Sequence, residues 1–211
     1  MKINYKKEYF NKLSEKNSST LDHYKDFLKQ KNILLKDKKI ADFGCARGLF
    51  FEDIMEDNEC MGYDISSFAI DFCKEKFKKG SFELFDLNKD QLNKENTFDL
   101  IILLDTIEHL DNLSNLKNVI RYNLKNNGFL VLTTPNANSF LRFLLGKKNY
   151  TGEMDKTHTI LFTPYTLDFF LRRCGLQKIT LSTPYSFYFN DNLITRTILY
   201  GGQIFAIYKK Y

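Results

Sequence analysis

Short apolar runs alternate with longer amphipathic segments along residues 39–134. The apolar runs predict strands at 39–43, in a segment ending at Asp64, and at 82–85, 98–104 and 128–134. The intervening segments have helical spacing of apolar residues at 49–57, 66–79 and 111–124. Strands and helices that alternate in this way predict βαβ units and a parallel sheet. The run at 98–104 is the most apolar, as expected of a strand buried on both faces.

The C-terminal part of the chain departs from this alternation. A helix is predicted at 165–174, closed by Gly175, and strands are predicted at 177–181 and 203–209. Because only a loop joins these last two strands, they cannot be linked by a helical crossover, and an antiparallel end to the sheet is expected. The expected fold class is α/β, with a Rossmann-like seven-stranded, mostly parallel sheet, an antiparallel C-terminal strand and helices on both faces.

The chain length of 211 residues suits one such domain, 1–211, with residues 1–38 as an N-terminal helical cap. The net charge of +5 comes from scattered basic residues, a pattern typical of solvated helix faces that disfavours nucleic acid as a partner. The four cysteines have no CxxC spacing, which argues against a disulfide framework or a zinc knuckle. With no signal-like N-terminus and no long uncharged apolar run, a cytoplasmic location is expected.

Polar residues stand at the ends of the predicted strands, where ligands bind in doubly wound sheets. After the first strand, Gly44 and Gly48 allow a tight turn and a close approach of the backbone to a ligand. Asp64 ends the second strand and can accept hydrogen bonds from two ribose hydroxyls. Asp86 and Leu87 follow the third strand, where an acid and a backbone N–H can contact an adenine edge. These features indicate an adenosine-type cofactor, with NAD, another nucleotide or simple turn geometry as alternatives.

Six segments in order resemble the class I S-adenosylmethionine (SAM)-dependent methyltransferases, in the group whose fourth strand runs into an E-H-L sequence. They are DFGCARG, GYDISSFAI, ELFDL, FDLIILLDTIEHL, GFLVLTTPN and HTILFTPYTLDFFLRRCGL. The resemblance covers residues 37–183 and the closing strand. It implies SAM as cofactor, with binding residues Asp42, Gly44, Cys45, Ala46, Gly48, Asp64, Ile65, Asp86, Leu87, Leu103 and Leu104. The family usually has glycine where this chain has Ala46.

Within this resemblance each residue has an expected role. The loop from Gly44 to Gly48 would surround the methionine moiety, and Asp42 would position its ammonium group. Asp64 would hold the ribose. A nicotinamide-binding domain is the first competitor, but it needs a third glycine opening the helix, where this chain has Leu49.

Asp105, Glu108 and His109 have the spacing i, i+3, i+4, and would share one face if their segment were helical. His158 lies further along the chain. His109 or His158 could act as a catalytic general base toward an acceptor hydroxyl. All four residues could instead bind a divalent metal, in a pattern similar to the metal site of small-RNA 3′-end 2′-O-methyltransferases. A third interpretation is that Glu108 and His109 only brace the loop.

Segments 136–163 and 184–201 are predicted to select the methyl acceptor, since both are rich in aromatic residues and lie outside the sheet. The alternative is that these aromatic residues only cover the edge of the sheet. The expected reaction is O-methylation of a small molecule or saccharide precursor. Alternatives are a quinone or lipid-linked acceptor, an RNA 2′-O-methyltransferase with a divalent metal, and a SAM-binding partner subunit without catalysis. The basic, amphipathic segment at 136–150 is compatible with peripheral membrane contact. No stable protein partner is predicted.

Overall fold

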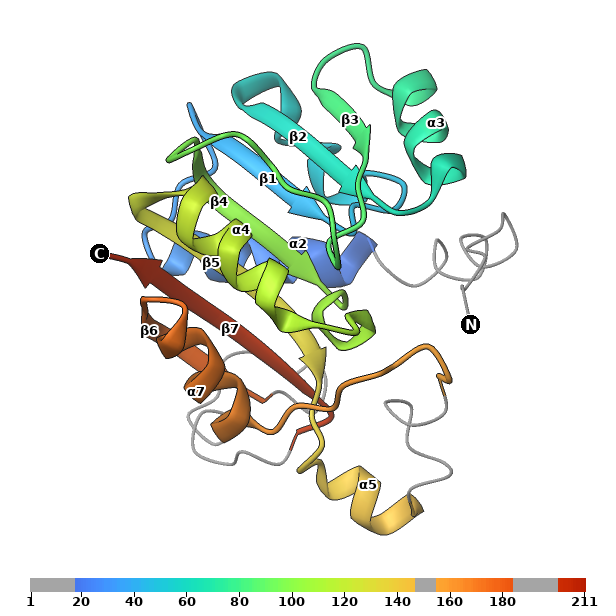
Figure 1. Ribbon diagram of the computed structural model, residues 1–211, viewed down its shortest axis with the longest axis vertical. Coiled ribbons are helices and arrows are strands. Elements are labelled where there is room, and N and C mark those ends of the chain that lie inside the picture. Colours follow the sequence, from blue (N-terminus) through green and yellow to red (C-terminus); the bar gives the residue numbers. More distant parts are fainter. Residues whose placement is uncertain (1–17, 147–154, 184–200) are drawn as a thin grey trace. The chain divides into compact units, whose positions relative to one another are not determined.

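The computed structural model describes residues 18–146, 155–183 and 201–211 (Figure 1). The chain divides into two compact units, the first ending at Asp86 and the second beginning at Leu87. The single domain expected from the sequence stays a prediction. The predicted cap, 1–38, and the predicted acceptor segments, 136–163 and 184–201, lie partly outside the described residues.

The first unit contains three parallel strands in the order β3-β2-β1. The strands are β1 (Lys39–Phe43), β2 (Glu59–Asp64) and β3 (Ser81–Leu84). β1 lies in register with β2, so that Asp42 is opposite Gly62 near the carboxyl ends of both strands. Stacked rings of Phe43 and Tyr63, with centroids 4.8 Å apart, fill the core at this end. Polar residues that follow these strands therefore start from a rigid, buried base.

Helices α2 (Ser18–Gln30) and α3 (Ser67–Lys76) accompany these strands, and α3 lies beside β2 and β3 (Figure 1). The Ser66 hydroxyl caps α3 by accepting the backbone N–H of Ala69. The prediction of one helix over 49–57 was wrong, because two short 3-10 helices, η1 (Leu49–Phe51) and η2 (Met55–Asp57), occupy this segment. The side-chain amide of Asn58 donates to the carbonyl of Ile54 at 2.7 Å, and so takes the acceptor that an α-helical N–H would use.

The second unit contains four strands in the order β4-β5-β7-β6. They are β4 (Phe98–Leu104), β5 (Leu124–Pro135), β6 (Leu176–Ser182) and β7 (Gln203–Lys210). β4 and β5 are parallel, whereas β7 is antiparallel to both β5 and β6. The predicted antiparallel end is therefore confirmed, as is the seven-stranded, mostly parallel α/β class.

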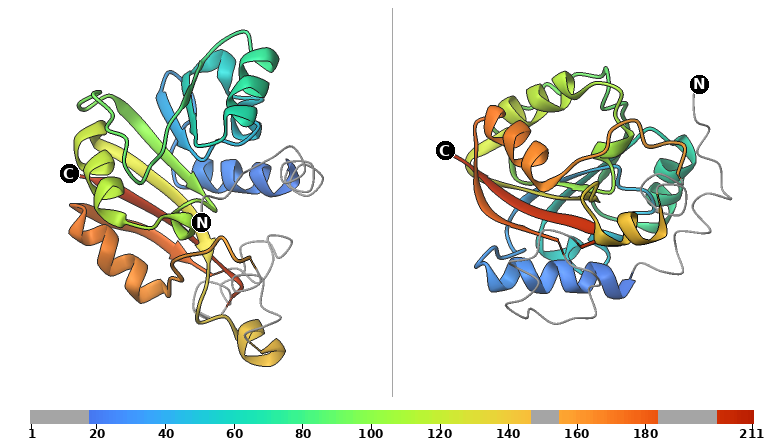
Figure 2. Two further views of the ribbon diagram at one scale, coloured as in Figure 1. Left: turned by 45° about the vertical axis from the view of Figure 1, so that its right-hand side comes forward. Right: turned by 90° about the horizontal axis from the view of Figure 1, so that it is seen from below.

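Helices of the second unit cover its strands on one face (Figure 2). α4 (Leu113–Asn123) packs against β5 and α7 (Pro164–Arg173) against β6. Thr163 and Thr166 form a capping box at the start of α7, with Pro164 at its first position. The remaining helices are η3 (Ile107–His109) and α5 (Phe140–Leu145). In the described parts of the chain, no helix combines the length and hydropathy needed to cross a bilayer.

Candidate functional site

The loop that follows β1 turns back tightly on the end of β2. The N–H groups of Gly44 and Cys45 both donate to the carbonyl of Tyr63, at 2.7 and 3.1 Å. Gly44 and Gly48 have φ angles of 82° and 69°. A Cβ on Gly48 would lie 2.6 Å from the ring of Phe77, so this position requires glycine for its space as well as its backbone conformation. The predicted tight turn is thus present in the first unit.

Asp64, the last residue of β2, holds this loop in place. One oxygen of its carboxylate accepts the N–H of Ala46 at 2.9 Å and the other accepts the N–H of Ser66 at 2.8 Å. Burial raises the pKa of Asp64, while the N–H groups of Ser66, Ala46 and Ile65 oppose the shift. A carboxylate has about four acceptor sites, so beside these three N–H groups Asp64 keeps acceptor capacity for a hydroxyl of a ligand.

Ala46 replaces the glycine that the resemblance leads one to expect. Its φ angle is 47°, in the left-handed region, which costs about 1 kcal/mol for a residue with a Cβ. The Cys73 thiol donates to the Ala46 carbonyl at 3.3 Å, and the Ala46 N–H is held by Asp64. Contacts on both sides of the residue therefore hold alanine in this conformation.

Asp42 lies within β1 and is buried, with 3% of its surface exposed. One of its carboxylate oxygens, Oδ1, has no hydrogen-bond partner among the described residues. Burial, and secondarily the charge of Asp64, raises the pKa of Asp42 to about 8. A buried carboxylate with an unpartnered oxygen favours a cationic ligand such as an ammonium group.

The other residues predicted to bind a cofactor are distributed over both units. In the first unit, Ile65 exposes half of its side chain and Asp86 is half-buried beyond β3. In the second unit, Leu87 and Leu103 are buried and Leu104 is half-buried. Their contacts with a cofactor stay predictions.

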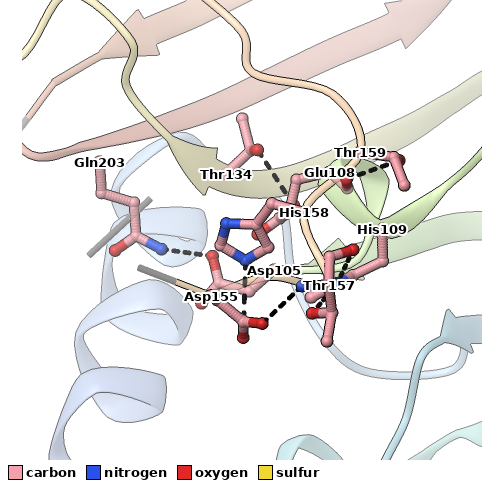
Figure 3. A network of polar contacts seen from close by, with 9 residues as sticks. All are labelled: Asp105, Glu108, His109, Thr134, Asp155, Thr157, His158, Thr159 and Gln203. Carbon is pink, nitrogen blue, oxygen red and sulfur yellow. Dashed lines mark hydrogen bonds and ion pairs between the residues drawn. The ribbon is translucent and has the colours of Figure 1, made fainter. Parts of the chain in front are cut away.

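Asp105 follows β4 in the second unit, and its backbone has a φ angle of 49°. Its Oδ1 accepts the Thr133 hydroxyl at 3.0 Å. The same oxygen accepts the side-chain amide of Gln203 at 2.6 Å (Figure 3). Of Asp105, Glu108 and His109, only Glu108 and His109 lie in the 3-10 helix η3 (Ile107–His109). Asp105, Glu108 and His109 therefore do not share one helix face, although their spacing would allow it in a continuous α-helix.

Glu108, in the 3-10 helix η3, is fully buried. Its Oε2 accepts the Thr134 hydroxyl at 3.0 Å, whereas its Oε1 has no hydrogen-bond partner within the described residues. Burial, followed by the nearby charge of Asp105, raises its pKa well above the usual range of a carboxyl group. An unsatisfied buried oxygen of this kind is costly unless a ligand contacts it.

Backbone hydrogen bonds to η3 hold the segment after His158 in place, so that His158 lies beside His109. The N–H groups of Thr159 and Ile160 both donate to the Glu108 carbonyl, at 2.9 and 3.1 Å. As a result the rings of His109 and His158 lie with centroids 4.7 Å apart and planes inclined by 63° (Figure 3). The structure thus brings together Glu108, His109 and His158, which we call the Glu–His–His cluster.

Two residues that the sequence analysis missed surround this cluster. The hydroxyl and carbonyl of Thr157 lie 2.8 and 3.3 Å from Nδ1 of His109. A carboxylate oxygen of Asp155 lies 3.9 Å from Nε2 of His158. The D-x-T spacing of Asp155 and Thr157 could have predicted a turn here, because the Asp155 carboxylate accepts the Thr157 N–H at 2.9 Å. Burial and the neighbouring His158 lower the pKa of His109.

One ligand atom from each member of the Glu–His–His cluster lies within 4.8 Å of the other two. Two imidazoles and a carboxylate at this separation can hold a divalent ion or transfer a proton. Asp105, the fourth residue of the metal set considered from the sequence, is directed to Thr133 and Gln203 instead.

Comparison with known proteins identifies related sequences. A sequence profile described as a methyltransferase domain matches residues 12–181. An uncharacterized protein of Methanocaldococcus jannaschii is 33% identical over 107 residues, which is 51% of this chain and 45% of that protein. The match thus spans less than half the length of this curated relative.

Solved structures show the same fold. A SAM-dependent methyltransferase from Archaeoglobus fulgidus is 24% identical, with a TM-score of 0.70 over 96% of this chain and 100% of the other. Magnesium protoporphyrin IX methyltransferase from Synechocystis, solved with bound S-adenosylhomocysteine (SAH), is 15% identical. Its TM-score is 0.67 over 92% of this chain and 83% of the other.

Proposed function

The chain belongs to the methyltransferase domain family, and from this premise we propose that it binds SAM and transfers the methyl group to an oxygen of a small molecule or saccharide precursor. The solved structures that share its fold include SAM-dependent methyltransferases. The proposal assigns cofactor binding to the strand ends of the first unit and proton removal from the acceptor to the Glu–His–His cluster.

The observation that carries the proposal is the position of Asp64. Its carboxylate is fixed by the N–H groups of Ala46 and Ser66, and keeps acceptor capacity for a ligand beside the backbone N–H groups that contact it. The ribose of SAM supplies a hydroxyl donor for this remaining capacity. Because the same carboxylate fixes the loop after β1, ribose binding and the shape of the methionine-binding loop depend on one residue.

Asp42 supports the same cofactor. SAM carries an ammonium group on its methionine moiety, and the unpartnered Oδ1 of Asp42 is a suitable acceptor for it. An ammonium group beside Asp42 offsets part of the cost of burying a carboxylate. The side chain of Ile65, half exposed after β2, would provide an apolar contact for the adenine.

Methyl transfer is an in-line displacement at the carbon bound to the sulfonium. The acceptor oxygen forms a bond to this carbon, the carbon–sulfur bond breaks toward sulfur, and SAH leaves. The hydroxyl proton must also depart, and we assign this step to the Glu–His–His cluster with His109 and His158 as its catalytic residues. Alignment of the acceptor supplies a further share of the rate.

The acceptor class rests on the segment that follows β5. α5 exposes Phe140 and Leu144, and Arg142 lies between them in the sequence. Because residues four positions apart lie on one helix face, these two exposed apolar side chains suit a flat or partly apolar acceptor. Scattered basic charge gives less support to RNA.

The proposal is tested by measuring SAH formation from SAM with four acceptor groups: phenolic small molecules, saccharides, quinols in detergent, and RNA. Turnover with small hydroxylated molecules or saccharides supports the proposed acceptor, whereas turnover confined to RNA contradicts it. SAM binding without turnover on any acceptor would favour a non-catalytic SAM-binding subunit.

A further inference from the structure

We propose that Glu108, His109 and His158 bind one divalent first-row transition-metal ion. Ion binding follows from the cluster itself, whereas the role of the ion in catalysis rests on the proposed function. One ligand atom from each of the three residues lies within 4.8 Å of the others, close enough for a central ion to contact all three after small side-chain adjustments.

The carboxylate ligand is already in place. Glu108 has no exposed surface, and its Oε2 is fixed by the hydroxyl of Thr134 at 3.0 Å. Its Oε1 is buried and has no hydrogen-bond partner in the described part of the chain. A cation is the ligand that best compensates a buried carboxylate oxygen, because it supplies the charge and the contact that the protein does not.

The imidazole ligands are oriented by the loop from Asp155 to Thr159. The Thr157 carbonyl near Nδ1 of His109 can only accept a hydrogen bond, so it favours the tautomer with the proton on Nδ1 and the lone pair on Nε2. Metal-binding histidines are commonly oriented by such a carbonyl or carboxylate on the opposite ring nitrogen. Asp155 adds a carboxylate 3.9 Å from Nε2 of His158, which increases the negative charge beside the cluster.

The donor set indicates the type of ion. Two imidazoles and one carboxylate suit Mn²⁺, Fe²⁺, Co²⁺, Ni²⁺ or Zn²⁺, whereas Mg²⁺ and Ca²⁺ favour oxygen ligands. Three protein ligands also leave coordination positions open, which is typical of catalytic rather than structural sites. With an ion bound, His109 and His158 would be its ligands and not general bases, and an acceptor hydroxyl on the ion would lose its proton to solvent more readily.

Cobalt titration tests the site directly, with untagged protein freed of metal by a chelator and then desalted. The wild type is expected to bind one equivalent of Co²⁺ and to develop visible d–d absorption bands. Glu108→Gln and His158→Ala should each weaken binding at least about tenfold, in line with the loss of a ligand or its support. His23→Ala is the matched control and should bind as the wild type does, since the exposed His23 lies outside the cluster.

Three results would overturn the site: no Co²⁺ binding by the wild type, unchanged binding by both cluster variants, or a thiolate-to-cobalt charge-transfer band. The last would place the ion on one of the four buried cysteines. SAH affinity measured on the same samples separates the two proposals. If SAH binds and Co²⁺ does not, only the metal site fails; if Co²⁺ binds and SAH does not, only the proposed function fails. Circular dichroism of each variant checks that it is folded.

Discussion

The hydroxyl of Thr157 lies 2.8 Å from Nδ1 of His109, and the carbonyl of the same residue lies 3.3 Å from that nitrogen. One residue therefore contacts His109 through both its side chain and its backbone. Thr157 is 48 positions along the chain from His109, and its own N–H is held by Asp155. The orientation of His109 thus depends on a turn in a distant loop.

Thr157→Val removes the hydroxyl and keeps the carbonyl and the side-chain shape. Because Nδ1 of His109 then loses one of its two contacts with Thr157, we expect the affinity for Co²⁺ to fall by about tenfold. The measurement is the cobalt titration described above, with Thr180→Val as the control, because Thr180 lies on β6 and is not part of the cluster. Equal affinity of wild type and Thr157→Val would show that Thr157 does not position the ligand.

Gly48→Ala should destabilise the first unit by more than the backbone strain of an alanine at positive φ would cause. The new Cβ would meet Phe77 at 2.6 Å, and Phe77 is itself stacked on Phe82 with centroids 5.4 Å apart. We expect a loss of roughly 2–3 kcal/mol in the free energy of unfolding, from backbone strain and overpacking together.

Gly175→Ala is the matched control, since Gly175 also has a positive φ, of 85°, but has open space around its Cβ position. Its expected loss is about 1 kcal/mol, from backbone strain alone. Urea unfolding of both variants gives the two free energies. Equal losses would show that the contact with Phe77 is relieved without cost.

SAH binding is expected to release a proton at neutral pH. In the free protein the pKa of Asp42 is about 8, so its carboxyl is mostly protonated at pH 7. A bound ammonium group lowers this pKa, and the affinity for SAH should therefore increase as the pH rises from about 6 to 7.5. Calorimetry in two buffers of different ionisation enthalpy measures the released proton. Heats that do not depend on the buffer would contradict contact between Asp42 and the ammonium group, and Asp42→Asn should abolish the effect.

The same residue makes the stability of the free protein depend on pH. The pKa of Asp42 is about 8 in the folded protein and about 4 in an unfolded chain. Its contribution to stability is therefore present below about pH 4 and is lost as the pH rises through about 8. Relative to Asp42→Asn, the wild type should lose free energy of unfolding between pH 5 and pH 8. Parallel urea-unfolding results for both proteins would refute this.

The sequence predicted strands well where an apolar run has clear limits. The predicted ranges for Lys39–Phe43 and Phe98–Leu104 agree with β1 and β4 at both ends, because polar or turn-forming residues flank both runs. The resemblance to class I SAM-dependent methyltransferases is confirmed by the family match over residues 12–181 and by the shared fold. The prediction of one helix over 49–57 was wrong because the side-chain amide of Asn58 binds the Ile54 carbonyl, an acceptor that an α-helix would use. The periodicity of apolar residues cannot indicate this competition.

The candidate site was less accessible to sequence reasoning. Asp64 could be identified because it ends a strand at a fixed distance from the glycine loop. The contact between Asp105 and Gln203 joins residues 98 positions apart, and it depends on the antiparallel placement of β7. Likewise, only the docking of Thr159 on the Glu108 carbonyl explains why His158 lies beside His109.

Calorimetric titration of SAH into wild type and Asp64→Ala tests the central claim most directly. Loss of a charged hydrogen-bonding partner should cost about 1.5–3 kcal/mol in binding free energy, roughly a 10- to 150-fold weaker affinity. Asp71→Ala is the control, because Asp71 is an exposed carboxylate on α3 of the same unit. The account predicts tight binding by wild type and Asp71→Ala, and weak binding by Asp64→Ala. Equal affinities of all three proteins, or no SAH binding by the wild type at millimolar concentration, would contradict it.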